Sequence, residues 1–198
     1  MDLPALLRHA DLLLAAEPCC LQLRGKQLGL TELCALGHAL RPLCTRNQIP
    51  FCVNDRLDVA LAVGADVIHL GQSDLPLAEV LHLREQFAIE GLRVGISTHD
   101  VEQAKAAEAA GADYIGFGPV FSTQTKADAA PTVGLVALRE VTSAVGLPVV
   151  AIGGITLDNV DSVAQAGANA AAAIAAIDQA ADPTWAGRTI ARAFGAVR

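Results

Sequence analysis

The stretch "DVEQAKAAEAAGADYIGFGPV", residues 100–120, joins one helix signal to one strand signal. An alanine-rich amphipathic segment ends at Gly111, and a β-rich apolar run starts three residues later at Tyr114. Glycine is typical of a helix C-terminus, and a short run of β-branched and aromatic residues is typical of a buried strand. The same order recurs at 156–177, where "TLDNVDSVAQAGA" precedes "NAAAAIAAI". The repetition predicts successive helix–strand units with parallel strands.

Seven runs of this kind lie along the chain, at 20–24, 50–54, 67–71, 93–98, 114–120, 148–154 and 170–177. No break in composition separates them, which predicts a single domain over residues 1–198. Polar residues follow the C-terminal ends of the runs, as in barrel enzymes, and no run leads into a G-x-G-x-x-G fingerprint. The predicted fold is therefore α/β, a (β/α)8 TIM barrel. We expect its first strand to be lacking or truncated, because only one helix-like segment precedes the first run.

Bulk composition narrows the classes of function. Of the 198 residues, 53% are hydrophobic and 18% are charged, and the net charge of −7 argues against a nucleic-acid partner. The apolar runs are too short to span a bilayer, and the N-terminus lacks the basic region of a signal peptide. We expect a cytoplasmic protein that binds no membrane. Its five cysteines lack metal-ligand spacing, which predicts reduced, mostly buried thiols.

The first run ends in Gln22, Arg24 and Lys26, spaced two residues apart. On a strand this spacing puts all three side chains on one face, where two cations suit a polyanion. A solvated edge with surface charges explains the same pattern equally well.

Two acids follow the next two runs. Asp55 comes after Asn54 at the end of the second run, and Asp74 follows the third. Mg²⁺ takes one or two carboxylates together with substrate phosphates, although helix capping is the commoner use of aspartate. His69, inside the third run, is more typical of a structural histidine.

The later run ends supply hydroxyl, ammonium and backbone donors. Ser97 lies near the end of the fourth run. His99, two residues later, is expected at the surface. Thr123, Thr125 and Lys126 follow the fifth run in a loop that is long enough to hold a phosphate.

The last two runs point to backbone contacts with a ligand. The glycine pair of "AIGGIT" allows either close backbone approach to a ligand or tight packing. The helix that we expect near Asp178 occupies the usual position of a barrel phosphate site.

Five segments together resemble the thiamine phosphate synthase family: "LQLRGK", "VNDRLDVALAVGADVIHLGQSDLP", "GISTHD", "ADYIGFGPVFSTQTK" and "VVAIGGIT". The resemblance covers roughly residues 18–182, in the family's order and spacing. It implies a (β/α)8 barrel that joins a pyrimidine pyrophosphate to a thiazole phosphate, giving thiamine phosphate and pyrophosphate with the help of Mg²⁺. It also implies a dissociative substitution, and it hints at a homodimer.

The resemblance assigns roles to individual residues. Those contacting the pyrimidine and its pyrophosphate are Gln22, Arg24, Lys26, Asn54, Ser97 and Lys126, of which Arg24, Lys26, Ser97 and Lys126 are the candidate catalytic residues. Asp55 and Asp74 are the implied metal ligands. The implied thiazole phosphate contacts are Thr123, Thr125, and backbone around Gly154 and Ile174.

Two departures from the family pattern affect these expectations. Ala170 and Ala175 stand where the family has a glycine and a serine in its last strand. Loss of the serine hydroxyl costs roughly 1.5–3 kcal/mol of phosphate binding, which predicts weakened affinity. The second departure is the absent first strand, which predicts an open barrel with unpaired backbone.

Three other functions remain open at this stage. A thiazole tautomerase-like isomerase would need a histidine at the fifth strand end, where this chain has Pro119. A non-catalytic phosphate-binding paralogue fits the altered last strand but not the retained acids. A barrel acting on another sugar phosphate fits the strand ends but not the linked motifs.

Overall fold

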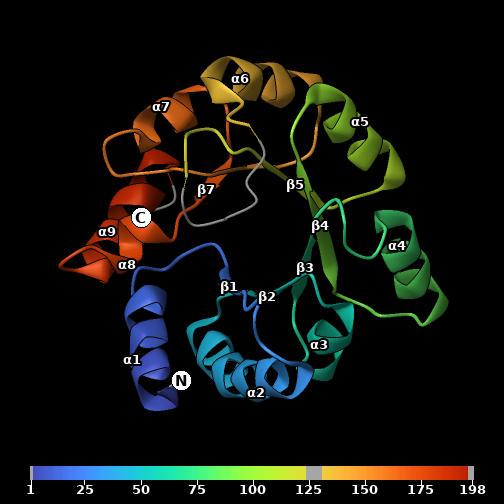
Figure 1. Cartoon of the computed structure of the whole chain (residues 1–198), viewed down its shortest axis with the longest axis vertical. Coiled ribbons are helices and arrows are strands. Elements are labelled where there is room, and N and C mark those ends of the chain that lie inside the picture. The colour runs from blue at the N-terminus through green and yellow to red at the C-terminus, as the bar shows by residue number, and fades with distance from the viewer. Residues whose placement is uncertain (1, 124–130, 196–198) are drawn as a thin grey trace. The chain divides into compact units, whose positions relative to one another are not determined.

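The computed structural model describes residues 2–123 and 131–195. The chain divides into two compact units, Met1–Val94 and Gly95–Arg198, and each is built of strands that alternate with helices (Figure 1). Across the described ranges, every helix is too short or too polar to cross a membrane. The single-domain organisation stays a prediction.

The first unit holds three strands in the order β1-β2-β3, all parallel. Gln22 lies opposite Cys52, and Val53 lies opposite Ile68. Helices α2 and α3 pack on these strands, and α1 packs on α2 (Figure 1). The elements are α1 (Leu3–Leu14), β1 (Leu21–Leu23), α2 (Leu30–Asn47), β2 (Phe51–Asn54), α3 (Leu57–Ala62), β3 (Val67–Leu70) and α4 (Leu77–Gln86).

The second unit continues the alternation, with the strand order β4-β5-β6-β7 and parallel pairing throughout. Strand β4 starts two residues before this unit begins. The elements are β4 (Arg93–Thr98), α5 (Val101–Ala110), β5 (Tyr114–Phe117), α6 (Gly134–Ala144), β6 (Val149–Ile152), α7 (Val160–Gln165), β7 (Ala170–Ala172), α8 (Ala175–Asp178) and α9 (Pro183–Ala193).

The predicted α/β class with parallel strands is confirmed, since each of the seven runs contains a strand. Most strands are shorter than the predicted runs, and the reason is clear for β5 and β7. Strand β5 stops at Phe117, because Pro119 has no N–H to continue the ladder. The alanines after β7 form α8 instead of a longer strand, as expected from the high helix propensity of alanine. Within the described residues α1 comes before the first strand, and the open barrel with a missing first strand stays a prediction.

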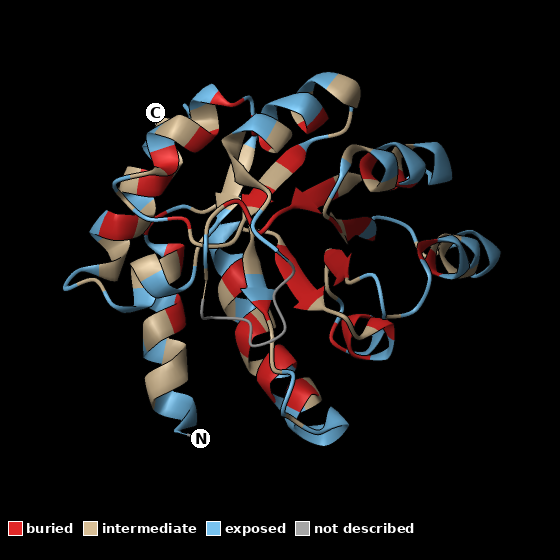
Figure 2. Cartoon of the chain, turned by 45° about the horizontal axis from the view of Figure 1, so that its top comes forward, coloured by how far each residue is buried: buried red, intermediate tan, exposed pale blue. Residues whose placement is uncertain are grey.

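Each unit has its own core, visible as the buried strands and inner helix faces of Figure 2. Phe51 and Ile68 are fully buried in the first unit, and Phe117, Ile115 and Leu138 are fully buried in the second. Burial of each such side chain contributes about 1.5–3 kcal/mol before entropy is counted.

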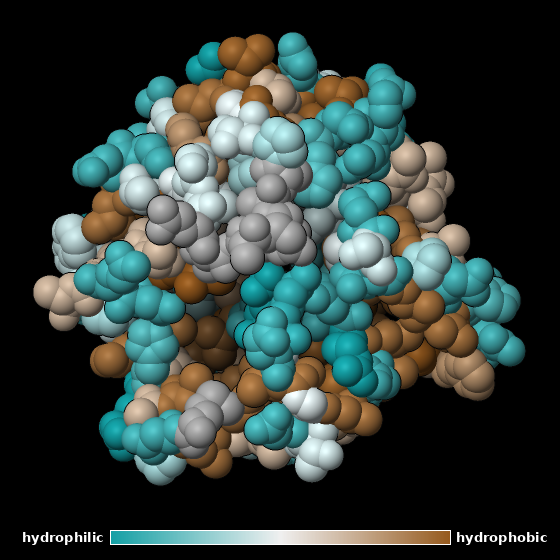
Figure 3. Space-filling view, viewed as in Figure 1, coloured by the Kyte–Doolittle hydropathy of each residue, from teal (hydrophilic) through white to brown (hydrophobic). Residues whose placement is uncertain are grey.

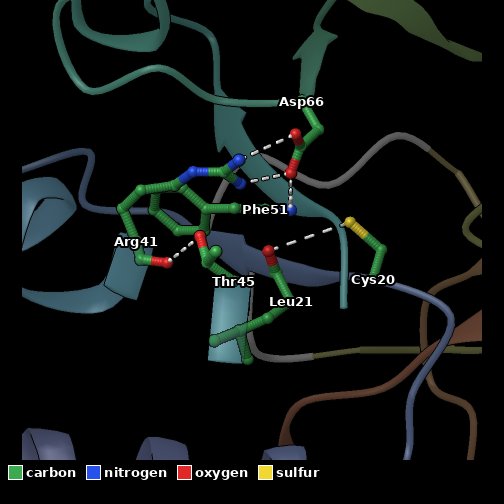
Figure 4. A network of polar contacts seen from close by, with 6 residues as sticks. All are labelled: Cys20, Leu21, Arg41, Thr45, Phe51 and Asp66. Atoms are coloured by element: carbon green, nitrogen blue, oxygen red, sulfur yellow. Dashed lines mark hydrogen bonds and ion pairs between the residues drawn. The ribbon is translucent and has the colours of Figure 1, made fainter. Parts of the chain in front are cut away.

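The five cysteines carry free thiols. Cys20 donates to the backbone oxygen of Leu21, 3.8 Å away (Figure 4). A hydrogen bond with Cys52 and burial both raise the pKa of Cys20 above its ordinary value. Because the thiolate is the reactive form, the raised pKa makes the Cys20 thiol a poor nucleophile.

Asp66 ties the first unit together at the start of β3 (Figure 4). Its carboxylate accepts hydrogen bonds from the Arg41 guanidinium of α2 and from the Phe51 N–H of β2, the latter at 2.8 Å. Its backbone oxygen accepts from Arg93 N–H at 2.9 Å. Burial acts to raise the pKa of Asp66, but the bonds from Arg41 and Phe51 outweigh it and hold the pKa below 3.8.

Replacing Asp66 by asparagine removes the charge and keeps an oxygen that accepts from Phe51. Because about a third of each side chain of the Arg41–Asp66 pair is exposed, we expect the free energy of unfolding at pH 7 to fall by about 1–2 kcal/mol. The lowered pKa places this contribution above pH 3.8 and removes it as the pH falls further. Urea unfolding at pH 7 and pH 3 measures the loss in the free energy of unfolding relative to the wild type. We expect this loss to be smaller at pH 3 than at pH 7.

Asp11 provides a matched control, because it pairs with Arg46 at 2.8 Å on the exposed surface of the same unit. Asp11→Asn changes the free energy of unfolding by about 0.5 kcal/mol or less. Equal losses from the two variants would show that Asp66 contributes no more than a surface ion pair.

Candidate active site

Four charged residues of the first unit lie at or just beyond the C-terminal ends of β1, β2 and β3. Arg24 and Lys26 lie in the loop after β1, Asp55 directly follows β2, and Asp74 lies in the loop after β3. Parallel strands end at one edge of their sheet, so neighbouring loops of this unit bring these side chains near one another.

Asp55 has an unusual backbone conformation, with φ at +65°. Its N–H donates to His69 O at 2.8 Å, which extends the pairing of Asn54 with His69 by one further bond. Left-handed backbone is costly for most side chains and is tolerated by aspartate and asparagine. The side chain of Asp55 does not cap α3, whose N-cap residue is Arg56.

The carboxyl group of Asp74 lies close enough to Asp55 to affect its ionisation. Burial and this second carboxyl together raise the pKa of Asp55 to about 6, against the smaller opposing effects of Lys26 and Arg24. Asp74 accepts the Gly71 N–H at 2.7 Å through Oδ2, and it does not cap α4, whose N-cap residue is Pro76. The two carboxyl groups therefore lie together, and Asp55 gives up its proton less readily than an isolated aspartate does.

Two cations lie beside this carboxyl pair. Lys26 Nζ is 3.8 Å from Asp55 Oδ2, and Arg24 is near enough to lower the pKa of Asp55. The alternation of side chains along a strand does not explain the positions of Arg24 and Lys26, because β1 ends at Leu23. A turn follows the strand, and in it Leu28 N–H donates to Gly25 O. The loop after β1 still brings both cations close to Asp55. Their binding of a polyanion stays a prediction.

Gln22 and Asn54 complete the predicted set in this unit. Gln22 is exposed in β1, and its Nε2 donates to Cys52 Sγ at 3.5 Å. Asn54 is the half-buried last residue of β2. Both lie at the same strand ends as the charged residues.

The pair Asp55–Asp74 fits a divalent cation. Two neighbouring carboxylates repel each other when they are alone, and together they provide hard oxygen ligands for a cation that offsets this repulsion. No third acid, histidine or cysteine joins them into a larger metal-binding group among the residues described. Mg²⁺ suits such a site, because it keeps several waters and binds substrate phosphates.

The carboxyl pair opens onto a hollow of about 500 Å³. Arg56 and Asp58 form a two-point ion pair on its wall, with distances of 2.9 and 2.5 Å. Figure 3 shows hydrophilic surface next to apolar surface over α3. The lining residues are Asp55, Arg56, Leu57, Asp58, Leu61, Asp74 and Leu75.

In the second unit, Ser97 and Thr123 are both half-buried. Ser97 lies in β4 opposite Gly116 of β5. Thr123 lies beyond the end of β5, and Ile174 is the exposed residue that precedes α8. The predicted residues Thr125 and Lys126 lie outside the described residues.

Gly154 is explained by packing. Its φ is +65°, and a Cβ at this position would lie 2.5 Å from Ser122 O. The close neighbour of this glycine is therefore the chain itself, which favours the packing interpretation of the "AIGGIT" glycines. Contact between its backbone and a ligand stays a prediction.

Sequence reasoning misjudged His99. It was expected at the surface, but it is half-buried and its Nδ1 lies 2.5 Å from Gly118 O. Its position two residues after Ser97, at a strand end, was the available signal.

Replacing Asp55 by asparagine tests how the raised pKa of Asp55 affects stability. Since its pKa is raised from 3.8 to about 6, the folded protein binds the Asp55 proton more tightly than the unfolded chain does. The stability that the proton provides is lost as the pH rises from about 4 to about 6. In metal-free buffer at pH 8, we expect Asp55→Asn to raise the free energy of unfolding by about 1–2 kcal/mol, with no gain near pH 4.

Urea unfolding with a chelator measures this difference, and added Mg²⁺ stabilises the wild type but not the variant. Asp58→Asn is the control, because Asp58 lines the same hollow but pairs with Arg56. We expect Asp58→Asn not to raise the free energy of unfolding at pH 8. Added Mg²⁺ should stabilise this variant as it stabilises the wild type. Lower stability of Asp55→Asn at pH 8 would mean that the attraction of Lys26 outweighs the repulsion of Asp74.

Comparison with known proteins agrees with this arrangement of residues. The family model described as thiamine monophosphate synthase matches residues 3–177. The thiamine-phosphate synthase of Methanospirillum hungatei is 46% identical over 171 residues, covering 86% of this chain and 81% of that protein. The protein of the same name from Methanocella arvoryzae is 45% identical over 187 residues, covering 94% and 85%.

A solved structure gives the same result. Thiamine phosphate pyrophosphorylase from Pyrococcus furiosus matches with a TM-score of 0.86 and 33% identity, over 98% of this chain and 90% of that one. The strand-end acids and cations therefore lie in a chain whose sequence and fold both match one enzyme family. The chain belongs to the thiamine monophosphate synthase family.

Proposed function

We propose that this protein is a transferase that joins 4-amino-5-hydroxymethyl-2-methylpyrimidine pyrophosphate to thiazole phosphate. The bond from the pyrimidine methylene carbon to the pyrophosphate oxygen breaks, and the thiazole nitrogen bonds to that carbon. Thiamine phosphate and pyrophosphate are released. The observation that carries the proposal is the Asp55–Asp74 carboxyl pair with Lys26 and Arg24 beside it, in a chain of this family.

The first unit supplies the groups for the pyrophosphate. Lys26 and Arg24 hold its negative charge as it leaves, and charge-assisted hydrogen bonds of this kind are the strong ones. Gln22 and Asn54 orient the pyrimidine ring. Mg²⁺, bound by Asp55 and Asp74, would neutralise further charge on the leaving group.

The second unit supplies the groups for the thiazole phosphate. Thr123 and Thr125 donate hydroxyl hydrogen bonds, with backbone at Gly154 and Ile174. Ser97 and Lys126 bind the pyrimidine pyrophosphate. A dissociative substitution needs charge stabilisation and exclusion of water, and no side chain has to form a covalent bond. Cytoplasmic location and a homodimer are part of the same proposal.

Incubation of the chain with both substrates and Mg²⁺ should yield thiamine phosphate, and Asp74→Asn should remove most of this activity. The variant keeps an oxygen that accepts from Gly71 and loses the charge that holds the cation. We expect its rate to fall by about a hundredfold or more, because loss of a direct ligand should cost at least as much as the roughly 10–100-fold that loss of an outer partner costs. Product is measured chromatographically, with circular dichroism on both proteins.

Asp58→Asn is the matched control, with a rate expected to stay within about twofold of wild type, because surface ion pairs contribute little. A folded wild-type chain that makes no product would overturn the transferase and favour the non-catalytic phosphate-binding paralogue.

Ala175→Ser tests the altered phosphate end. Ala175 is the exposed first residue of α8, where an added hydroxyl is free to donate to a phosphate. We expect KM for thiazole phosphate to fall roughly tenfold, the effect of one hydrogen bond to a charged group. KM for the pyrimidine pyrophosphate should stay unchanged. An unchanged KM for thiazole phosphate would mean that Ala175 does not limit its binding.

A further inference from the structure

His99 is bound from two directions at the exit of β4. Its backbone N–H donates to Gln103 Oε1 at 2.9 Å, and Gln103 N–H donates to Asp100 Oδ1 at 2.7 Å. Asp100 is the N-cap residue of α5, so the start of this helix fixes the His99 backbone. The imidazole is half-buried and directed at the neighbouring strand exit, where its Nδ1 lies 2.5 Å from Gly118 O.

The last residue of β4, Thr98, and the residue after it, His99, engage both polar backbone groups of Gly118. Its N–H donates to Thr98 O at 3.2 Å, and its carbonyl oxygen receives the His99 ring. Gly118 has no side chain to hold it. A Cβ there would lie 2.1 Å from Ile152 O, which explains why the position needs glycine. The His99 ring is therefore a side-chain anchor for a residue that has none.

The chain beyond Gly118 is bonded to the exit of β6. Val120 N–H donates to Ile152 O at 2.8 Å, and Phe121 N–H donates to Gly153 O at 3.0 Å. Val133, further along the chain, also contacts this segment, because its N–H donates to Pro119 O at 2.9 Å. Segment 118–121 is thus the root from which the chain leads to Thr123.

We infer that His99 is a positioning residue, which holds the root segment 118–121 and through it the position of Thr123. Nδ1 acts as the donor, so the imidazole carries its proton on that nitrogen. The histidine touches no substrate in this role. Its consequence for thiazole phosphate binding rests on the proposed function, whereas its hold on the root segment does not.

The inference is tested with three variants of His99 and one control. His99→Leu removes the donor and keeps bulk, and His99→Ala serves if the leucine protein does not fold. His99→Asn puts an amide nitrogen where Nδ1 was and restores the donor. His82→Ala, at an exposed histidine of α4, is the matched control. Thermal unfolding establishes that each protein is folded.

The first readout is amide hydrogen exchange in the peptide that covers residues 114–123. We expect the Val120 and Phe121 amides to exchange roughly tenfold faster in His99→Leu, the effect of one lost hydrogen bond. In His99→Asn and His82→Ala they should exchange at the wild-type rate. Wild-type exchange in the leucine or alanine variant would overturn the inference, and so would fast exchange in the asparagine variant.

The second readout is steady-state kinetics. The leucine variant should show KM for thiazole phosphate roughly tenfold higher, with KM for the pyrimidine pyrophosphate within about twofold, and asparagine should restore both. An equal rise in both values would overturn the assigned link to Thr123. If the wild type makes no product, the proposed function fails, and the exchange experiment still decides the role of His99.

Discussion

The closeness of two carboxyl groups, those of Asp55 and Asp74, is the constraint on which the site of the first unit depends. Bringing Asp74 to Asp55 works against folding at neutral pH, since burial and a like charge both disfavour ionisation. The rest of the unit offsets this cost. Lys26 and Arg24 lower the pKa of Asp55, Gly71 N–H bonds Asp74, and the bond from Asp55 N–H to His69 O holds the backbone. The divalent cation that we propose for this pair would offset the repulsion between the two carboxylates.

The sequence was sufficient for the elements and for the acids. Alternation of helix and strand signals located all seven strands, because each run is short, apolar and followed by a helix signal. Asp55 and Asp74 were predictable because their strands are neighbours in the chain and in the sheet. The strand-end rule therefore succeeded where sequence neighbours are also spatial neighbours.

Details that depend on backbone geometry were not predictable. The two-residue spacing of Arg24 and Lys26 suggested that both lie on a strand. In the structure β1 ends at Leu23, and a turn at Gly25 follows. His99 was expected at the surface because nothing in its neighbours reveals the Gly118 carbonyl, which lies nineteen residues away along the chain. Gly154 suited a ligand as well as packing, and only the contact with Ser122 distinguishes the two.

The left-handed backbone of Asp55 limits what this position can become. Only glycine, asparagine and aspartate adopt that conformation readily, so few replacements remove the charge without also disturbing the bond to His69. A descendant of this chain that abandoned catalysis would therefore drift toward asparagine or glycine at position 55. Either residue there would preserve the outline of the site after its charge had gone. Shape alone is then a poor guide to activity in such a descendant, and the carboxylate itself is the feature to look for.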